Sequence, residues 1–398
     1  MPDPGHHKFE RWEALPAVGV AALLLLWAVP AMRDNTPDDL RVLYAGGVAA
    51  WETGHPERAR DWLSTAFLGL VMAIVSRAGS LRAATVALNV LNLVIVIAML
   101  VAAWSWLRGR LTPRLWWATL ACAVSYSPIL STIRWKQLNL AVLFLAVVGF
   151  ALLRRGRART GAATLGLSLA LKPLVILLPF ALLSRKDSRV AGALCLAATA
   201  ALTFAGQGFL AWRGHDVALL SPVPVLQNFG KHASGFLTEP ENLSPQAMVQ
   251  RLTRRNDPLQ RGAVLLGVAL AILLANESLR RSSGRSWEVF AFSLVLSTLV
   301  GPISWSHYQV LLLPMFVLLA CQFGQERASP VLWLTLGYAF ILASLVQRPL
   351  ELTVPGALRL LITGRLETWD DVLQVLMLSQ FAPYLLYGAA FSWFSRKP

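Results

Sequence analysis

The sequence predicts an all-α polytopic integral membrane protein, built as one domain over residues 1–398. Of its residues, 56% are hydrophobic and only 14% are charged, whereas about 25% of the residues in a soluble domain are charged. The apolar residues form long runs, and basic residues cluster in the short segments between them, as on the cytoplasmic side of membrane proteins. We therefore expect about twelve membrane segments, with both termini in the cytoplasm.

The charge balance and the cysteines narrow the class of partner. The formal charge is +15, but the basic residues follow the positive-inside pattern, so we expect a lipid bilayer and no nucleic acid as partner. Cys122, Cys195 and Cys321 lie within apolar runs and show neither a disulfide framework nor metal spacing. No set of His, Asp and Glu has the spacing of metal ligands, and no Walker loop or nucleotide-binding glycine motif occurs. The sequence therefore predicts neither a metal nor a cofactor.

The apolar runs define the order of the membrane segments. The first run, Ala14–Met32, has no clear small-x-small cleavage site, so we expect a retained anchor. Loops 33–61, 213–261 and 348–371 mix both signs of charge and are assigned to the outer face. The further expected spans are Ala83–Leu107, Leu115–Pro128, Leu140–Leu153, Val190–Trp212, Arg261–Leu279, Trp287–Val300, Tyr308–Phe323, Pro330–Val346 and Val372–Phe394, with outer turns at Ile129–Asn139 and Gly301–Tyr308.

Two segments are irregular. Trp62–Val75 is too short for a full span of roughly 20 residues, so we expect a juxtamembrane or re-entrant helix. Thr160–Ser184 has basic clusters on both flanks and must enter and return on the same side. It therefore predicts two short helices hinged at Leu171-Lys172-Pro173, because a proline disfavours helix at the residue before it.

The segment after the first span carries a pair of carboxylates. Thr36 is suited to cap a helix, Pro37 suits its first turn, and Asp38 and Asp39 complement its dipole. Leu40, Leu43, Tyr44 and Gly47 follow at amphipathic spacing. This pattern by itself favours a capped interfacial helix whose acids only solvate its start; the alternative is a carboxylate beside a site.

Polar and ionisable groups near membrane depth are costly unless they face a cavity or a partner. Lys172 stands at the predicted break, His307 in the last outer turn, and Arg134 and Lys136 in an earlier one. Each cation also has a plain structural explanation, since lysine and arginine snorkel to the interface and a single histidine is often a hydrogen-bonding group. Together they predict an outward-facing cationic cavity that suits a lipid phosphate, with a carboxylate at its rim to deprotonate a hydroxyl. Further expected lining residues are Gln137, Asn139, Trp305, Asn228 and His232.

Several of these stretches resemble one known family. Asp39–Ala45 reads Asp-x-x-Val-x-Tyr-Ala, Trp135–Asn139 reads Trp-Lys-Gln-Leu-Asn, and Leu169–Pro173 reads Leu-Ala-Leu-Lys-Pro. The most specific is Gly-Pro-Ile-Ser-Trp-Ser-His at Gly301–His307. Their order over about residues 14–325 resembles glycosyltransferase family 87, membrane enzymes of the GT-C type. The chain departs from that family at Tyr308, where a second histidine is usual, and at 64–67, where an aromatic and proline-rich pattern is usual.

The resemblance implies a fold and a chemistry. It implies a GT-C bundle in the bacterial plasma membrane, with interfacial helices in the first outer loop and a site facing outward. The donor would be a polyprenyl-phosphate sugar, such as mannose, and the acceptor a cell-envelope glycolipid or glycan. Asp39, with Asp38 as the close alternative, would be the general base, while Lys172, His307, Arg134 and Lys136 would bind the donor phosphate. A transporter or flippase for lipids is the alternative class, because it also needs broken helices and charges within the membrane.

Overall fold

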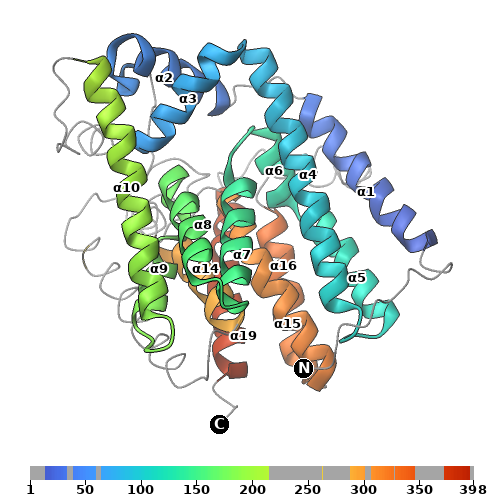
Figure 1. The fold of residues 1–398 in the computed structure, drawn as a ribbon. Helices are drawn as coiled ribbons and strands as arrows, with labels where there is room; N and C mark the ends of the chain where they lie inside the picture. Colours follow the sequence, from blue (N-terminus) through green and yellow to red (C-terminus); the bar gives the residue numbers. More distant parts are fainter. Residues whose placement is uncertain are drawn as a thin grey trace.

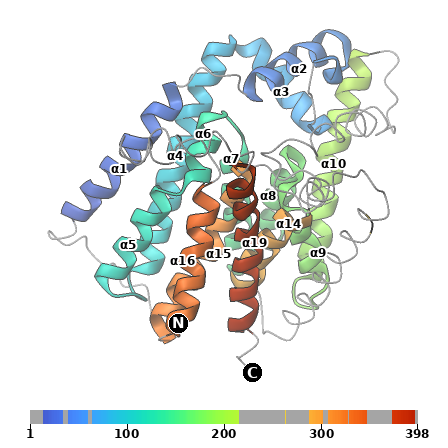
Figure 2. The same ribbon diagram turned by 180° about the vertical axis from the view of Figure 1, so that it is seen from behind.

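The structure, a computed structural model, describes residues 14–33, 39–59, 64–214, 262, 287–300, 306–326, 328–345 and 372–394. The regular elements in these ranges are helical. Long helices run through a bundle, and two shorter ones, α2 (Asp39–Thr53) and α3 (Ala66–Ala78), lie together over one end of it (Figure 1). Seen from behind, α16 and α19 lie side by side, and α10 runs up to the α2–α3 layer (Figure 2).

Several helices suit a bilayer. Four segments of the described chain are long and apolar enough to cross a membrane: α1 (Ala14–Arg33), α4 (Leu81–Leu107), α10 (Arg189–Arg213) and residues Tyr308–Glu326. On α4, Val86, Val90 and Val94 recur every four residues and are more than half exposed, as expected for a face that contacts lipid. The protein is therefore a multi-pass membrane protein. The total of about twelve segments, the orientation of the termini and the re-entrant path of the segment near residue 70 stay predictions.

Most helices lie where the apolar runs predict them. The boundaries differ by a few residues at most for the spans expected at 14–32, 83–107, 140–153, 190–212, 287–300, 330–346 and 372–394, whereas the span expected at 261–279 lies outside the described residues apart from residue 262. The elements are α1 (Ala14–Arg33), α2 (Asp39–Thr53), η2 (Pro56–Arg58), α3 (Ala66–Ala78), α4 (Leu81–Leu107), α5 (Pro113–Val124), α6 (Ser127–Arg134), α7 (Asn139–Arg154), α8 (Ala158–Leu171), η3 (Pro173–Val175), α9 (Leu177–Leu183), α10 (Arg189–Arg213), α14 (Trp287–Val300), η4 (Ser306–Leu312), α15 (Leu313–Glu326), α16 (Pro330–Leu345) and α19 (Val372–Phe394).

One predicted turn is wrong. The segment 129–139 was expected as an outer turn after a span at 115–128, but the span ends at Val124 and a second helix, α6, continues to Arg134. Pro128 stands in the first turn of α6, where its missing N–H is not needed. Between the two helices Tyr126 is fully buried, and its hydroxyl donates to the carbonyl of Gln309 at 2.9 Å. The burial of this one side chain fixes a break that the hydrophobic pattern does not reveal.

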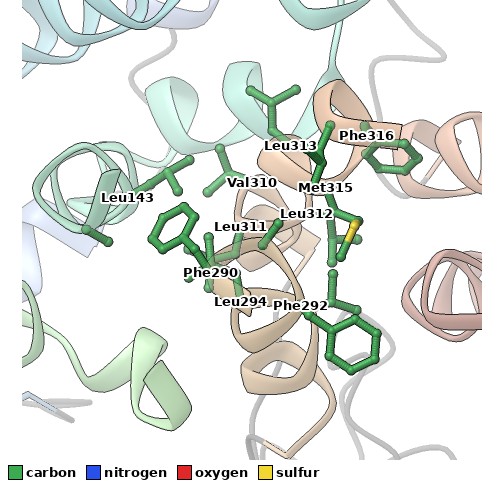
Figure 3. Packing of buried hydrophobic residues seen from close by; sticks show 14 of the residues in the cluster. Leu143, Phe290, Phe292, Leu294, Val310, Leu311, Leu312, Leu313, Met315 and Phe316 are labelled. Atoms are coloured by element: carbon green, nitrogen blue, oxygen red, sulfur yellow. The ribbon is translucent and has the colours of Figure 1, made fainter. Parts of the chain in front are cut away.

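The core lies around α14, η4 and α15. In Figure 3, Phe290 and Leu294 of α14 approach Leu143 of α7 and Val310 and Leu311 of η4. All five side chains are at most 1% exposed. This packing holds η4 against α7. It therefore places the start of α7 and the start of η4 beside the break between α8 and α9.

The predicted break between α8 and α9 is confirmed. Lys172 has extended backbone angles (φ −156°, ψ 124°) between the end of α8 and the short helix η3, which begins at Pro173. Upstream, the hydroxyl of Ser168 donates to the carbonyl of Val142 at 2.8 Å, which joins α8 to α7. Helix α8 is therefore held against α7, and the break at its end presents a lysine.

Candidate active site

Helix α2 begins at Asp39, and the start of this helix is tied to a distant turn. The backbone N–H of Asp39 donates to the carbonyl of Trp135 at 3.2 Å. A helix leaves its first N–H groups without partners inside the helix, so this carbonyl serves as an external cap. The sequence predicted a cap by Thr36, but Thr36 and Pro37 lie outside the described residues.

The underside of α2 fixes its position on the bundle. Leu40 and Leu43 are buried against side chains of α3 and α4. At Gly47 the backbone of α2 lies directly on that of Met72, so no side chain fits there. The hydroxyl of Tyr44 donates to the carbonyl of Gly79 at 2.8 Å. These contacts fix the position of α2 on the bundle, and with it the position of Asp39. The apolar cluster below α2 comprises Leu40, Leu43, Leu68, Met72 and Leu88.

The turn that caps α2 is itself strained. The N–H of Gln137 donates to the carbonyl of Thr132 at 2.9 Å, and that of Lys136 to the carbonyl of Ile133 at 3.1 Å. This pair of bonds is the Schellman pattern that ends a helix, with Lys136 in the left-handed conformation at φ 52°. Glycine is the usual residue there, and another residue costs roughly 1–2 kcal/mol. The lysine is also 1% exposed, and its Nζ donates to the carbonyl of Arg134 at 3.1 Å.

Lys172 joins this turn to the break between α8 and α9. Its Nζ donates to Oε1 of Gln137 at 2.6 Å and to Oδ1 of Asn139 at 3.0 Å. Both amides are buried, with 3% and 0% of their surface exposed. Two buried acceptors and one ammonium satisfy one another, because a buried polar group without a partner is costly.

Two further groups complete the cluster. The ring of Tyr308, in η4, lies 4.6 Å from Nζ of Lys172, a cation–π contact. The carboxylate of Asp39 interacts electrostatically with both Lys172 and Tyr308. An ammonium and an aromatic ring therefore meet from the α8–α9 break and η4, within the electrostatic influence of a carboxylate on α2.

The environment of Lys172 changes its acidity. This residue stands between two short helices and belongs to none of the candidate spans. Burial lowers the pKa of Lys172 to about 8, and the nearby Asp39 carboxylate opposes that effect. A charge that is removed from water favours its neutral form, whereas an opposite charge favours the ionised form. Lys172 is therefore mostly a cation at neutral pH and loses its charge in mild alkali.

The cluster brings together four of the predicted site residues: Asp39, Lys172, Gln137 and Asn139. Arg134 and Lys136 lie at the same turn, linked by their own hydrogen bond. The backbone of His307 lies in η4, next to Tyr308, but its side chain is outside the described residues. Also outside are Asp38, Trp305, Asn228 and His232.

Two neighbours of the cluster were not predicted as site residues. Tyr308 was noted only as a departure from the family pattern. Asn92 lies on α4, a candidate span, and is fully buried; its Nδ2 donates to the carbonyl of Gln137 at 3.4 Å. Asn92 could have been predicted from the sequence, because a polar residue inside an apolar run usually faces a cavity or a partner. Within the described ranges, no group of three or more His, Cys, Asp and Glu residues is placed to hold a metal ion.

A comparison with known families identifies the family of this chain. Residues 62–314, well over half of the chain, match glycosyltransferase family 87. The chain belongs to glycosyltransferase family 87. This family 87 enzyme is thus a membrane glycosyltransferase, which decides against the transporter alternative. The matched region includes Lys172 and Tyr308, while Asp39 precedes it.

One relative of the chain has a stated activity. The family 87 enzyme is 30% identical over 346 residues to the polyprenol-phosphate-mannose-dependent alpha-(1-2)-phosphatidylinositol mannoside mannosyltransferase of Mycobacterium tuberculosis. The match covers 79% of this chain and 77% of the relative. No solved structure matches the chain.

Proposed function

We propose that this glycosyltransferase moves a hexose, with mannose as the first candidate, from a polyprenyl-phosphate donor to a cell-envelope glycolipid or glycan. The reaction takes place at the outer face of the bacterial plasma membrane. The donor proposal is supported by the printed activity of the mycobacterial relative. The same relative makes a phosphatidylinositol mannoside the first acceptor to test.

The observation that carries the proposal is Lys172, held by Gln137 and Asn139 beneath the ring of Tyr308 and electrostatically coupled to Asp39. In the proposed reaction, the carboxylate of Asp39 takes the proton of the acceptor hydroxyl. The acceptor oxygen attacks the anomeric carbon, and the bond from that carbon to the phosphate oxygen breaks on the opposite face. The bonding electrons leave with polyprenyl phosphate, and the configuration at the anomeric carbon inverts. A phosphate leaves without protonation, so one base beside a cation is sufficient.

Lys172 is the best placed group for the leaving phosphate. An ammonium has three N–H donors, and Gln137 and Asn139 accept from two of them. We assign the third to a phosphate oxygen. The two amides and the Tyr308 ring hold the lysine in place before the substrate arrives, and such preorganisation is a large part of electrostatic catalysis. His307, Arg134 and Lys136 are proposed as further cations for the same phosphate. Gln137, Asn139, Trp305, Asn228 and His232 are proposed to line the cavity.

The test is transfer of radiolabelled mannose from polyprenyl-phosphate mannose to phosphatidylinositol mannosides and to a cell-envelope lipid extract, using the protein in nanodiscs. Wild-type protein is expected to label a lipid product. Asp39→Asn keeps the size of the side chain but cannot take a proton, so transfer should fall by roughly 10²–10⁴-fold. Asp187→Asn is the matched control, because Asp187 lies near Arg185, in the segment between α9 and α10. Equal activity of wild type and Asp39→Asn would remove Asp39 from the mechanism, and unlabelled lipids with every donor would contradict the proposed function.

A further inference from the structure

A second cluster of charged and aromatic residues lies at the opposite end of α2 from Asp39. The guanidinium carbons of Arg213 and Arg77 lie 5.1 Å and 5.4 Å from the centroid of the Trp51 ring. Arg213 is also 5.4 Å from the ring of Trp212. Two arginines and two tryptophans therefore form one surface, which we call the arginine–tryptophan cluster: Trp51, Arg77, Trp212 and Arg213.

The cluster is rigidly built. Nε of Arg213 donates to the backbone carbonyl of Trp51, which joins the end of α10 to the end of α2. Next to it, Gly54 has φ +73° and lies against the backbone of Leu210 and Gly214, where a Cβ would overlap. A residue other than glycine would be strained at this φ and would push the two helices apart. The two tryptophans are thus presented from fixed backbones.

The cluster lies at the end of a candidate membrane span. Arg213 is the last residue of α10, one of the candidate membrane spans. Near this end the helix exposes large apolar side chains, with Trp212 at 69% and Phe204 at 55%. A membrane helix changes from hydrocarbon to headgroups at its end, and tryptophan and arginine both favour that boundary.

General anchoring to the membrane would explain one arginine and one tryptophan there, but not two arginines on one ring. Both guanidinium groups contact the same indole ring, and no carboxylate among the described residues forms an ion pair with Arg77 or Arg213. An anion bound at the cluster would supply the opposite charge for both guanidinium groups. Arginine binds phosphate through a planar pair of N–H donors, so a lipid phosphate fits the site.

The cluster and Asp39 share a single helix. Trp51 follows Asp39 by twelve residues on α2, a distance of about 18 Å at 1.5 Å per residue. A lipid whose phosphate is at one end and whose reacting hydroxyl is at the other must carry several sugars between them. We propose that the arginine–tryptophan cluster binds the phosphodiester of an anionic glycolipid acceptor, whose outermost sugar then reaches Asp39. This inference extends the proposed function by assigning the acceptor a charge and a binding site.

The experiment compares two acceptors in nanodiscs of zwitterionic lipid with a fixed concentration of polyprenyl-phosphate mannose. One is a phosphatidylinositol oligomannoside, and the other carries the same oligomannose on a neutral alkyl anchor. For the double variant Arg77→Gln/Arg213→Gln, KM for the anionic acceptor is expected to rise by at least about tenfold, with little change in kcat. KM for the neutral acceptor should stay as in the wild type. Arg82→Gln is the control, because it removes an exposed positive charge from the first turn of α4, outside the cluster.

Three results would overturn the inference. An unchanged KM for the anionic acceptor in the double variant would show that the cluster does not bind it. An equal rise for both acceptors would indicate a structural effect, and an equal rise in Arg82→Gln would indicate attraction of anionic lipids in general. Failure of the wild type to label either acceptor would instead contradict the proposed function, so the two failures are distinguishable.

Discussion

The two breaks in the helical bundle differ in what they present at the interruption. Between α5 and α6, the interrupting residue is Tyr126, which is fully buried and packs against Phe316 and Phe340. Between α8 and α9, it is Lys172, which is held by two amides. In both cases a proline follows closely and begins the next helical turn.

Both breaks lie against consecutive residues of η4. The hydroxyl of Tyr126 donates to the carbonyl of Gln309, while the ring of Tyr308 covers Lys172. A proline stands in the next helical turn in each case, but the side chain at the interruption determines its use. The first break fills the core, and the second places a cation beside a carboxylate. We therefore expect substitutions at the first break to affect stability and substitutions at the second to affect transfer.

The largest expected effect is at Lys172. Lys172→Met keeps the length of the side chain but removes the charge, so kcat should fall by roughly 10²–10³-fold, as for other preorganised electrostatic groups. Lys172→Arg keeps the charge and should retain part of the activity. Kinetics of mannose transfer, with thermal unfolding as a check on folding, measure both. Normal transfer by a folded Lys172→Met protein would refute the contrast between the breaks.

The second effect is a dependence on pH. Because the pKa of Lys172 is lowered to about 8, the lysine is protonated below that pH and loses its charge above it. The kcat/KM for the donor should therefore fall towards tenfold per pH unit above about pH 8. Arginine stays charged in this range, so Lys172→Arg should lose this alkaline decline. The same decline in both proteins would assign it to another group.

The third prediction separates backbone strain from charge at Lys136. Lys136→Gly suits the left-handed conformation, whereas Lys136→Ala keeps the strain. Both remove the cation, so both should weaken use of the donor by a similar factor, of the order of tenfold. The glycine variant should unfold at the higher temperature of the two. Full activity of Lys136→Gly would leave the lysine with a structural role only.

The smallest effect on transfer is expected at the first break. Tyr126→Phe removes the hydroxyl that donates to the carbonyl of Gln309, at a cost of about 0.5–1.5 kcal/mol of stability. The rate of mannose transfer at a temperature well below unfolding should stay within about twofold of the wild type, because nearly all of the variant protein is still folded at that temperature. Thermal unfolding and transfer kinetics in the same nanodiscs give the comparison. A large loss of kcat in the folded Tyr126→Phe protein would mean that the first break also shapes the site.

Part of the cluster around Lys172 was predictable from the sequence. The break at Lys172-Pro173 follows from the geometry of proline, and the start of α2 at Asp39 follows the pattern of acids and apolar residues. The amides Gln137 and Asn139 were expected to line the substrate cavity; in the structure both accept from Lys172. Asp38, His307, Trp305, Asn228 and His232 stay predictions.

The sequence by itself determined the class of protein, most helix boundaries and the interruption at Lys172, because these depend on apolar run length, proline geometry and charge clusters within short segments. Only the tertiary structure decided that Trp135 caps the helix of Asp39 and that Tyr308 covers Lys172. It likewise decided that Arg213 meets Trp51. These partners are far apart along the chain, and their meeting depends on how the helices pack. A local pattern carries no information about that packing.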